Sequence, residues 1–339
     1  MTMNRAFPKF SAVFLGGILL SGFSALSADA ASGGLKYYAC SNYGVVSQVS
    51  VTAHSCPAGT TVVKGKFKGT DFSGVDFTNA NLAGANMSGA KLAGATSGHI
   101  TGSPASMPKG WQIVSGFLIG PGANLAQTNL TGVSFAKADL AGASFYQANL
   151  TNVDFGHSNL TQASLSSATL NGAKFVHAKM KGVISAYEKG QPASLPKYWK
   201  VITGLYESAP VEYLVGPGAS IGGAQLGGAD FSGMNLTGIY LAGAHLTSAN
   251  FTGANLTRAN LASAGLGTVN FTNANLTGAS VISADMSGAN LANAKFINAN
   301  LKGSRLLSVS NASSAKFKGA KCPDGLMYGN SGADCNLSF

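Results

Sequence analysis

The sequence GAQLG GADFS GMNLT GIYLA GAHLT SANFT GANLT runs from Gly223 to Thr257 and divides into groups of five residues. A large apolar residue stands fourth in each group, and a polar residue, often Asn, precedes it. The residue before that is nearly always Ala, and the pattern extends from Ile221 to Leu306. A strand repeats about every 2 residues and a helix about every 3.6, so neither places these apolar centres on one face. A short internal period of this kind predicts a solenoid.

The A-[DN]-[LF]-x-x pattern resembles the repeat of the pentapeptide-repeat proteins, and the resemblance covers about two thirds of the chain. It implies an all-β fold, a right-handed quadrilateral β-helix in which four pentapeptides form one coil. A solenoid of this kind accommodates 339 residues around one extended core, because each coil contacts only its neighbours.

Aromatic residues recur at a spacing that fits such a coil. If a coil has 20 residues, residues 20 apart stack directly, as Phe231, Phe251 and Phe271 would. Phe135, Phe155 and Phe175 would form a second column upstream. Stacked rings bury a large apolar area, and backbone groups pair between coils about 4.8 Å apart. We expect Ala to turn inward where nothing larger fits, Gly to supply the turns, and the Asn before each centre to point to solvent.

Two inserts, residues 95–123 and 183–219, interrupt the repeats and are copies of each other. They align at an offset of 88 residues, so that Trp111 matches Trp199 and Gly116 matches Gly204. The second copy then carries eight extra residues, LYESAPVE, before both end in a shared GPGA. A Ser-Gly or Thr-Gly turn between two apolar runs predicts a β-hairpin in each insert. The phenylalanine columns on either side of the second insert align only if that insert adds no face or one full coil.

Residues 1–30 are typical of a secretory signal peptide. Arg5 and Lys9 precede an apolar run from Phe10 to Leu26, and Ala28-Asp29-Ala30 fits a cleavage site. The alternative, an uncleaved anchor, is disfavoured because the run is short for a membrane span. We expect a secreted or periplasmic bacterial protein with no transmembrane span after cleavage.

Four cysteines lie outside the repeats, and an even number in an oxidising compartment indicates disulfides. Three pairings are possible. Local pairing, Cys40 with Cys56 and Cys322 with Cys335, is favoured because the two pairs lie at opposite ends of the repeats. This predicts small end modules at residues 31–64 and 322–339 around a β-helix of residues 65–321. The first module resembles a β-hairpin module of secreted bacterial proteins, whereas a zinc site is disfavoured because no CxxC pair or nearby His is present.

The acidic residues do not predict an active site. Six aspartates occupy the position before a centre, where they are best interpreted as variants of Asn: Asp71, Asp76, Asp139, Asp154, Asp230 and Asp285. Glu188, Glu207 and Glu212 lie in the second insert, and the first insert lacks all three. The histidines are isolated, and no GK[ST] follows the GPG turns. We therefore expect no enzyme, no cofactor and no metal.

The formal net charge of +10 favours an acidic partner, such as a cell-surface polymer. Lysines concentrate where the repeats begin and end: Lys64, Lys66, Lys68, Lys316, Lys318 and Lys321. The alternative is that they protect an open sheet edge from end-to-end stacking. Nucleic acid is a poor candidate, because no basic stripe alternates with aromatic residues.

Aromatic residues in the inserts are candidates for contact with a partner, since Trp and Tyr often anchor interfaces. The candidates are Trp111, Trp199, Tyr198, Tyr206 and Tyr213. For the two tryptophans we favour a structural role, in which each pins its hairpin to the coil.

The sequence bears on three classes of function. A non-enzymatic extracytoplasmic scaffold or binding protein agrees best with the sequence. The resemblance also raises the DNA-mimic role of topoisomerase-binding, quinolone-resistance members, but that role implies an acidic cytoplasmic protein, and the basic charge, export signal and cysteines oppose it. A glycan-processing enzyme requires a pair of carboxylates on adjacent coils, which the sequence does not reveal.

Overall fold

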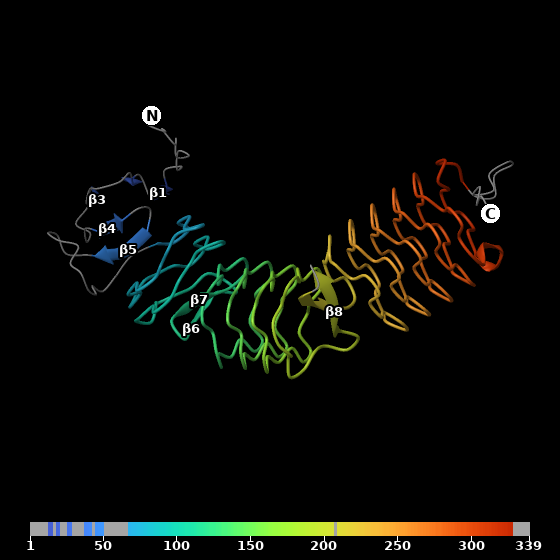
Figure 1. The fold of residues 1–339 in the computed structure, drawn as a ribbon. Helices are drawn as coiled ribbons and strands as arrows, with labels where there is room; N and C mark the ends of the chain where they lie inside the picture. The colour runs from blue at the N-terminus through green and yellow to red at the C-terminus, as the bar shows by residue number, and fades with distance from the viewer. Residues whose placement is uncertain are drawn as a thin grey trace, which may run out of the picture. The chain divides into compact units, whose positions relative to one another are not determined.

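The computed structural model describes residues 67–206 and 209–327, and the backbone of five short strands that precede residue 51. The chain forms two compact units, Met1–Leu125 and Ala126–Phe339. The five strands are β1 (Val13–Leu15), β2 (Ile18–Leu20), β3 (Leu26–Ala28), β4 (Tyr37–Asn42) and β5 (Val45–Ser50) (Figure 1). β4 and β5 pair antiparallel in the stretch where the sequence predicts a hairpin. Most of the predicted leader lies outside the described residues, as do Cys56, Lys64, Lys66 and Cys335.

A ladder of single parallel bridges defines the coils of both units. In the second unit Asp230 pairs with Asn250, and Asn250 pairs with Asn270, each at a sequence separation of 20. Bridges of the same spacing recur at every fifth residue, so one coil contains four bridge positions. The coils of this unit lie one beside the next in Figure 1. The coil length inferred from the sequence is therefore confirmed.

Backbone hydrogen bonds between coils explain why a five-residue repeat is stable. The Phe251 N–H donates to the Asn270 carbonyl (2.8 Å), and the Asn270 N–H donates to the Ala249 carbonyl (3.0 Å). Ala249 and Phe251 have 0 % exposure, so the small residue and the apolar centre both face the interior as expected. Each coil thus satisfies its buried polar backbone by pairing with its neighbours.

The turns at the corners between bridges require residues that tolerate a positive φ. The Ala254 N–H donates to the Phe251 carbonyl (2.9 Å), which closes a turn whose third residue, Gly253, has φ 66°. A type II turn requires a positive φ at this position, and Gly adopts it without steric cost. Asn273 occupies the same place with φ 58°, a conformation that Asn tolerates better than most residues.

The phenylalanine columns are present in the second unit. Ring centroids are 5.0 Å apart for Phe155 and Phe175, and 4.7 Å apart for Phe231 and Phe251. Both pairs are stacked, with interplanar angles of 11° and 10°. The interior of the coils is therefore packed by rings as well as by aliphatic side chains.

The second insert adds one full coil between these two columns. Ile184 pairs with Ser164 on one side and with Ser220 on the other, and Lys189 and Ser194 continue the ladder between them. Four steps therefore separate Ile184 from Ser220. Phe175 and Phe231 consequently lie on the same face, which confirms that the two columns align.

The inserts that leave the ladder are shorter than predicted. In the range 95–123, Thr101 pairs with Asn81 and Ser106 pairs with Asn86, so these residues still belong to a coil. The same holds for residues 184–194 in the range 183–219. The repeat pattern did not reveal these ladder positions, because Gly102 stands at one of the centre positions and is not a large apolar residue.

Each insert contains one antiparallel hairpin, as expected. The first consists of β6 (Gln112–Val114) and β7 (Phe117–Ile119), and the second of β8 (Lys200–Tyr206) and β9 (Ala209–Val215).

The ladder slips by one residue near its C-terminal end. Lys295 pairs with Lys316, and Asn300 pairs with Lys321, so each partner lies one position beyond the regular spacing. The single-turn 3-10 helix η1 (Ala312–Ser314) absorbs the extra residue. Beyond the slip the ring of Phe317 stacks on Phe296, with centroids 5.1 Å apart. Within the described residues, no helix has the length and apolar character needed to cross a membrane.

Candidate functional site

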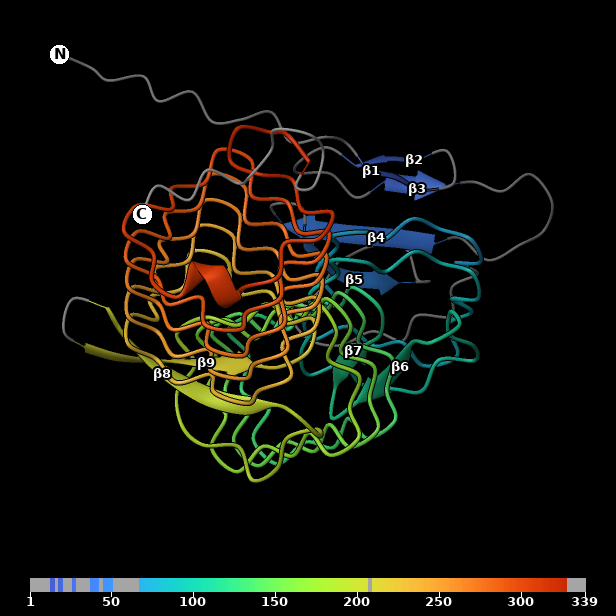
Figure 2. The ribbon, with the colours of Figure 1, turned by 90° about the vertical axis from the view of Figure 1, so that its right-hand side faces the viewer.

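The second hairpin differs from the first because its eight extra residues lengthen both strands. In the first hairpin the turn is formed by Ser115 and Gly116, with φ of 50° and 80°. Thr203 and Gly204, which align with them, instead lie inside β8 and pair with β9. The predicted Thr-Gly turn is therefore wrong, because the extension adds strand rather than loop. The strands grow from 3 to 7 residues, and the β8–β9 hairpin projects beyond the coils (Figure 2).

Both tryptophans pack against the glycine that opens the GPGA motif of their own insert. A Cβ added at Gly120 would collide with the ring of Trp111, and one at Gly216 would collide with the ring of Trp199. Trp199 is only 9 % exposed, and Trp111 packs against the buried core of the first unit. This packing agrees with the structural role that we favoured for them.

The tyrosines expected to contact a partner divide into exposed and buried members. Tyr198 and Tyr206 are 53 % and 44 % exposed, and Leu205, which precedes Tyr206, is 62 % exposed. Tyr213 is 1 % exposed, and its hydroxyl accepts a hydrogen bond from the Gln225 N–H (3.1 Å). Tyr213 therefore joins the hairpin to the next coil and is inaccessible, whereas Tyr198 and Tyr206 remain accessible.

Two glutamates meet at the base of this hairpin, although the sequence pattern did not predict that they would pair. Glu188 and Glu212 form an antiparallel bridge, although they are well separated in the sequence. Glu188 is 5 % exposed, and its Oε1 accepts from the Ala186 N–H (2.9 Å). Glu212 Oε1 accepts from Gln191 Nε2 (2.6 Å). The Oε2 atoms of both glutamates are buried and have no hydrogen-bond partner among the described residues.

Burial raises the pKa of Glu188 to about 8, and the nearby Glu212 carboxylate also acts in this direction. Hydrogen bonds from Ser185 and from backbone N–H groups oppose the shift without cancelling it. Glu188 is therefore predominantly protonated at neutral pH. The sequence held one signal for this pair, since Glu188, Glu207 and Glu212 are the only glutamates of the chain. Glu207 lies outside the described residues.

The first unit has no carboxyl groups at the corresponding place. Ile100, at the offset of 88 from Glu188, is 7 % exposed, and its N–H donates to the Gly116 carbonyl. The Glu188 N–H donates in the same way to the carbonyl of Glu212, which directly precedes Tyr213 as Gly116 precedes Phe117. Both units therefore share the backbone hydrogen bond between coil and hairpin, and the fold does not require the carboxyl pair.

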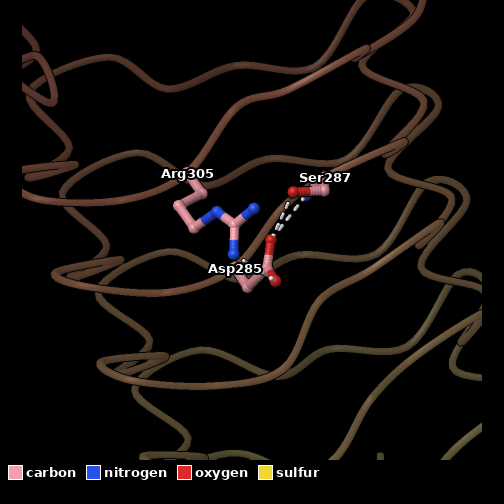
Figure 3. Close-up of polar contacts among 3 residues, drawn as sticks. All are labelled: Asp285, Ser287 and Arg305. Carbon is pink, nitrogen blue, oxygen red and sulfur yellow. Dashed lines mark hydrogen bonds and ion pairs between the residues drawn. The ribbon is translucent and has the colours of Figure 1, made fainter.

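The aspartates of the repeats perform the structural task of Asn. Asp285 Oδ1 accepts from the Ser287 N–H (3.0 Å) and from its hydroxyl (2.5 Å) (Figure 3). Arg305 Nη1 lies 3.9 Å from Asp285 Oδ2, and both side chains are largely exposed. The hydrogen bonds from Ser287 hold the pKa of Asp285 below its usual value. Asp285 is therefore an ionised turn residue, which agrees with its interpretation as a variant of Asn.

Basic side chains gather on the last coils, and we name them the C-terminal basic cluster. Its members are Lys295, Lys302, Lys316, Lys318 and Lys321. Lys295 and Lys316 occupy one bridge, so two like charges are neighbours on adjacent coils. The side chains of Lys302 and Lys321 both reach Gly325, where an added Cβ would lie 3.8 Å from each Cε atom.

Metal ligands do not converge within residues 67–206 and 209–327, where no group of three or more His, Cys, Asp or Glu side chains could hold a metal ion. His157 and His177 do stack on adjacent coils, with ring centroids 4.9 Å apart. Cys322 is buried and disulfide-bonded. The pairings proposed for the four cysteines stay predictions, because the other cysteine side chains are not described.

Comparison with known proteins identifies the repeat. A family model for pentapeptide repeats matches eight copies, at residues 66–96, 122–156, 148–184, 224–261 and 270–306. No curated protein matches the chain.

Among solved structures, HetL of the cyanobacterium Nostoc sp. strain PCC 7120 is 26 % identical to this chain. The match covers 78 % of this chain and 93 % of HetL, with a TM-score of 0.33. HetL is a pentapeptide repeat protein involved in heterocyst differentiation regulation. Rfr23 of the cyanobacterium Cyanothece 51142 is 33 % identical over 26 % of this chain and 58 % of its own, with a TM-score of 0.25. QnrB1, a plasmid-mediated fluoroquinolone resistance protein, is 14 % identical over 76 % of this chain and 91 % of its own, with a TM-score of 0.23.

The repeat matches agree with the regular ladder of the structure. The chain belongs to the pentapeptide-repeat family, whose members fold as right-handed β-helices.

Proposed function

We propose that this protein is a non-enzymatic extracytoplasmic scaffold that binds an acidic cell-surface polymer through the C-terminal basic cluster. The observation that carries the proposal is the bridge between Lys295 and Lys316, which places two exposed lysines on adjacent coils. Like charges that face each other across a ladder destabilise it. A polyanion would remove this repulsion, so the arrangement favours an anionic ligand.

The other charges near this bridge also favour an anionic ligand. Between residues 295 and 327 the chain carries Arg305 and the five cluster lysines against one acidic residue, Asp324. Arg305 lies near Asp285, but at 3.9 Å and with both groups exposed this pair neutralises little charge. A patch of one sign raises the local concentration of ligands of opposite charge. A single lysine row would suffice to protect a sheet edge, whereas this cluster spans successive coils.

The rest of the proposal follows from the repeat and the leader. A four-sided coil, with each face repeated once per coil, would present the cluster on a rigid support. The predicted signal peptide and terminal disulfides support export to the periplasm, the cell surface or the medium. The exposed Tyr198 and Tyr206 offer a second contact, for a surface protein. The topoisomerase-binding alternative is disfavoured, because it requires an acidic surface and the chain carries a formal charge of +10.

Retention of the mature protein on an immobilised acidic polysaccharide, in a salt gradient, tests the proposal. We expect the double variant Lys316→Glu and Lys318→Glu to elute at clearly lower salt than the wild type, because surface electrostatics dominate and salt screens them. The matched control is Lys137→Glu with Arg258→Glu, which changes the net charge equally at exposed sites of the same unit.

A neutral polysaccharide of similar chain length is the second control, and it should retain none of the variants. Equal loss of retention in the two double variants would show a response to net charge alone and would contradict a site at the C-terminal basic cluster. Release of sugar from the column material would contradict a non-enzymatic role.

A further inference from the structure

The attachment of the β8–β9 hairpin to the coils includes a pair of carboxyl groups with buried oxygen atoms, which its counterpart in the first unit lacks. Glu212 pairs with Thr203 inside the hairpin and with Glu188 outside it, so β9 lies between β8 and the coil. Residues that face each other in an antiparallel bridge place their side chains on the same side, with Cβ atoms about 4.5–5.5 Å apart. The two carboxyl groups are therefore neighbours.

In each carboxyl group one oxygen accepts a hydrogen bond and the other oxygen lacks the partner that a buried charge requires. Glu188 Oε2 and Glu212 Oε2 each expose less than 1 Å² and meet no hydrogen-bond partner in the described part of the chain. Two ionised carboxylates at such a place would repel each other, and no solvent reaches their Oε2 atoms to screen the charge. One proton removes the repulsion and also supplies the missing hydrogen bond. A substrate cannot reach these oxygen atoms, whereas a proton can.

We propose that Glu188 and Glu212 share one proton and so form a pH-sensitive latch that fastens the β8–β9 hairpin to the coil. The first unit holds Ile100 and Gly116 at these places, so an uncharged contact fastens that hairpin at every pH. The latch is specific to the longer hairpin, which bears the exposed Tyr206 and Leu205.

The nearby Glu212 carboxylate favours the protonated form of Glu188, whereas the hydrogen bonds from Ser185 and from backbone N–H groups favour its ionised form without overcoming the effect of burial. Glu212 lies opposite Glu188 on β9, and Tyr213, the next residue, interacts with Glu188 electrostatically. Tyr187 packs against Tyr213 with ring centroids 6.2 Å apart. Burial likewise raises the pKa of Tyr213. No lysine or arginine contributes to the shift of Glu188 among the described residues, so no cation compensates its ionised form.

The sign of the pH effect follows from the proton balance. The attached hairpin holds the proton until the pH passes about 8, whereas a detached, hydrated Glu188 releases it near 4.5. Attachment is therefore fully stabilised below pH 4.5 and weakens as the pH rises toward 8. Within this window the equilibrium constant for opening rises by up to about tenfold per pH unit.

Hydrogen exchange of the backbone amides of β8 and β9, corrected for the intrinsic pH dependence of exchange, measures this opening in the full chain. We expect the wild type to open progressively more between pH 5 and pH 8, by roughly tenfold per unit at most. Glu188→Gln, which cannot ionise, and Glu188→Ile, which introduces the residue of position 100, should remove the pH dependence. Amides of residues 250–290 report whether the coil itself stays folded in each variant.

Carbon-13 labelling of glutamate gives a direct second readout, because the chain contains only three glutamates. We expect one carboxyl signal to titrate above pH 7 and to move to lower pH in Glu212→Gln. Three signals that titrate near 4.5, or a wild-type slope retained in Glu188→Gln, would overturn the proposal. A titration displaced by added calcium or sodium ions at constant ionic strength would show that a cation occupies the site in place of the proton, and would overturn it as well.

Discussion

At the scale of single residues, the polar position before each apolar centre does more than face the solvent. Asn250 was expected to point outward, so that its replacement by Ala would change stability by no more than roughly 0.5 kcal/mol, as for most surface changes. Instead its Oδ1 accepts from the Thr252 N–H (3.1 Å) and hydroxyl (2.6 Å), and its Nδ2 donates to Asp230 (3.0 Å). The side chain thus satisfies a backbone donor that the turn leaves free.

This contact changes the predicted cost of removing the amide. Asn270, which bonds the Thr272 N–H (3.0 Å) and hydroxyl (2.6 Å) in the same way, is the better test because no aspartate neighbours it on the ladder. We expect Asn270→Ala to lower the free energy of unfolding by about 1 kcal/mol, the usual net value of a hydrogen bond. Asn270→Asp keeps the acceptor and serves as the control in chemical denaturation. Equal losses in the two variants would contradict a role for Oδ1.

The apolar centre of each repeat is buried, as predicted, and should contribute strongly to stability. Phe251 has 0 % exposure and contacts the rings of Phe231 and Phe271 at centroid distances of 4.7 and 5.4 Å. Phe251→Ala should cost about 3–5 kcal/mol through lost transfer free energy and a cavity. Chemical denaturation monitored by far-ultraviolet circular dichroism checks this value, and a loss no larger than that of Asn270→Ala would contradict the assignment of inward and outward positions.

At the scale of elements, the sequence predicted both hairpins but not the register of the second. The apolar runs and the Ser-Gly turn were sufficient for the first hairpin. In the second, eight inserted residues could form a loop or extend the strands, and the pattern alone does not distinguish these outcomes. The distinction is made by contacts with distant residues, such as the hydrogen bond between Tyr213 and Gln225. The carboxyl pair escaped prediction for the same reason, because the bridge that joins its members forms only once the strands are extended.

Gly204 shows how such a distant contact controls the hairpin. Its φ is not in the left-handed region, so the position needs no glycine for its backbone conformation. A Cβ there would nevertheless collide with the carbonyl group of Gln225 in the next coil. We expect Gly204→Ala to destabilise the protein by about 1–3 kcal/mol, the range for overpacked sites.

Gly227→Ala is the matched control for this change. The nearest atom to its added Cβ is the Thr247 carbonyl oxygen at 3.5 Å, an ordinary contact. This variant should be neutral or more stable than the wild type by up to about 1 kcal/mol, because alanine restricts the unfolded chain. Thermal unfolding compares the stability of the two variants. Equal stability would show that Gly204 is not in close contact with the Gln225 carbonyl group.

At the scale of the whole molecule, the repeat could be predicted because an apolar residue recurs at every fifth position. The coil length and the phenylalanine columns both follow from local spacing. The departures from the ladder, namely the hairpin, the carboxyl pair and the lysine bridge, depend on contacts between residues that are distant in the sequence. These departures are also where the proposed functions lie, because a surface that repeats uniformly offers no distinct site.

The central structural claim is that the ladder continues through the second insert, with one full coil from Ile184 to Ser220 and the hairpin at its end. Paired cysteine substitutions in the full chain, oxidised and located by mass spectrometry, test this most directly. The predicted result is an efficient cross-link for Ile184→Cys with Ser220→Cys, since bridged residues lie within disulfide reach. None is expected for Ile184→Cys with Gly204→Cys, although the regular spacing of the ladder would pair those positions. A cross-link in the second pair and none in the first would contradict the continuous ladder, and with it the placement of Glu188 beside Glu212.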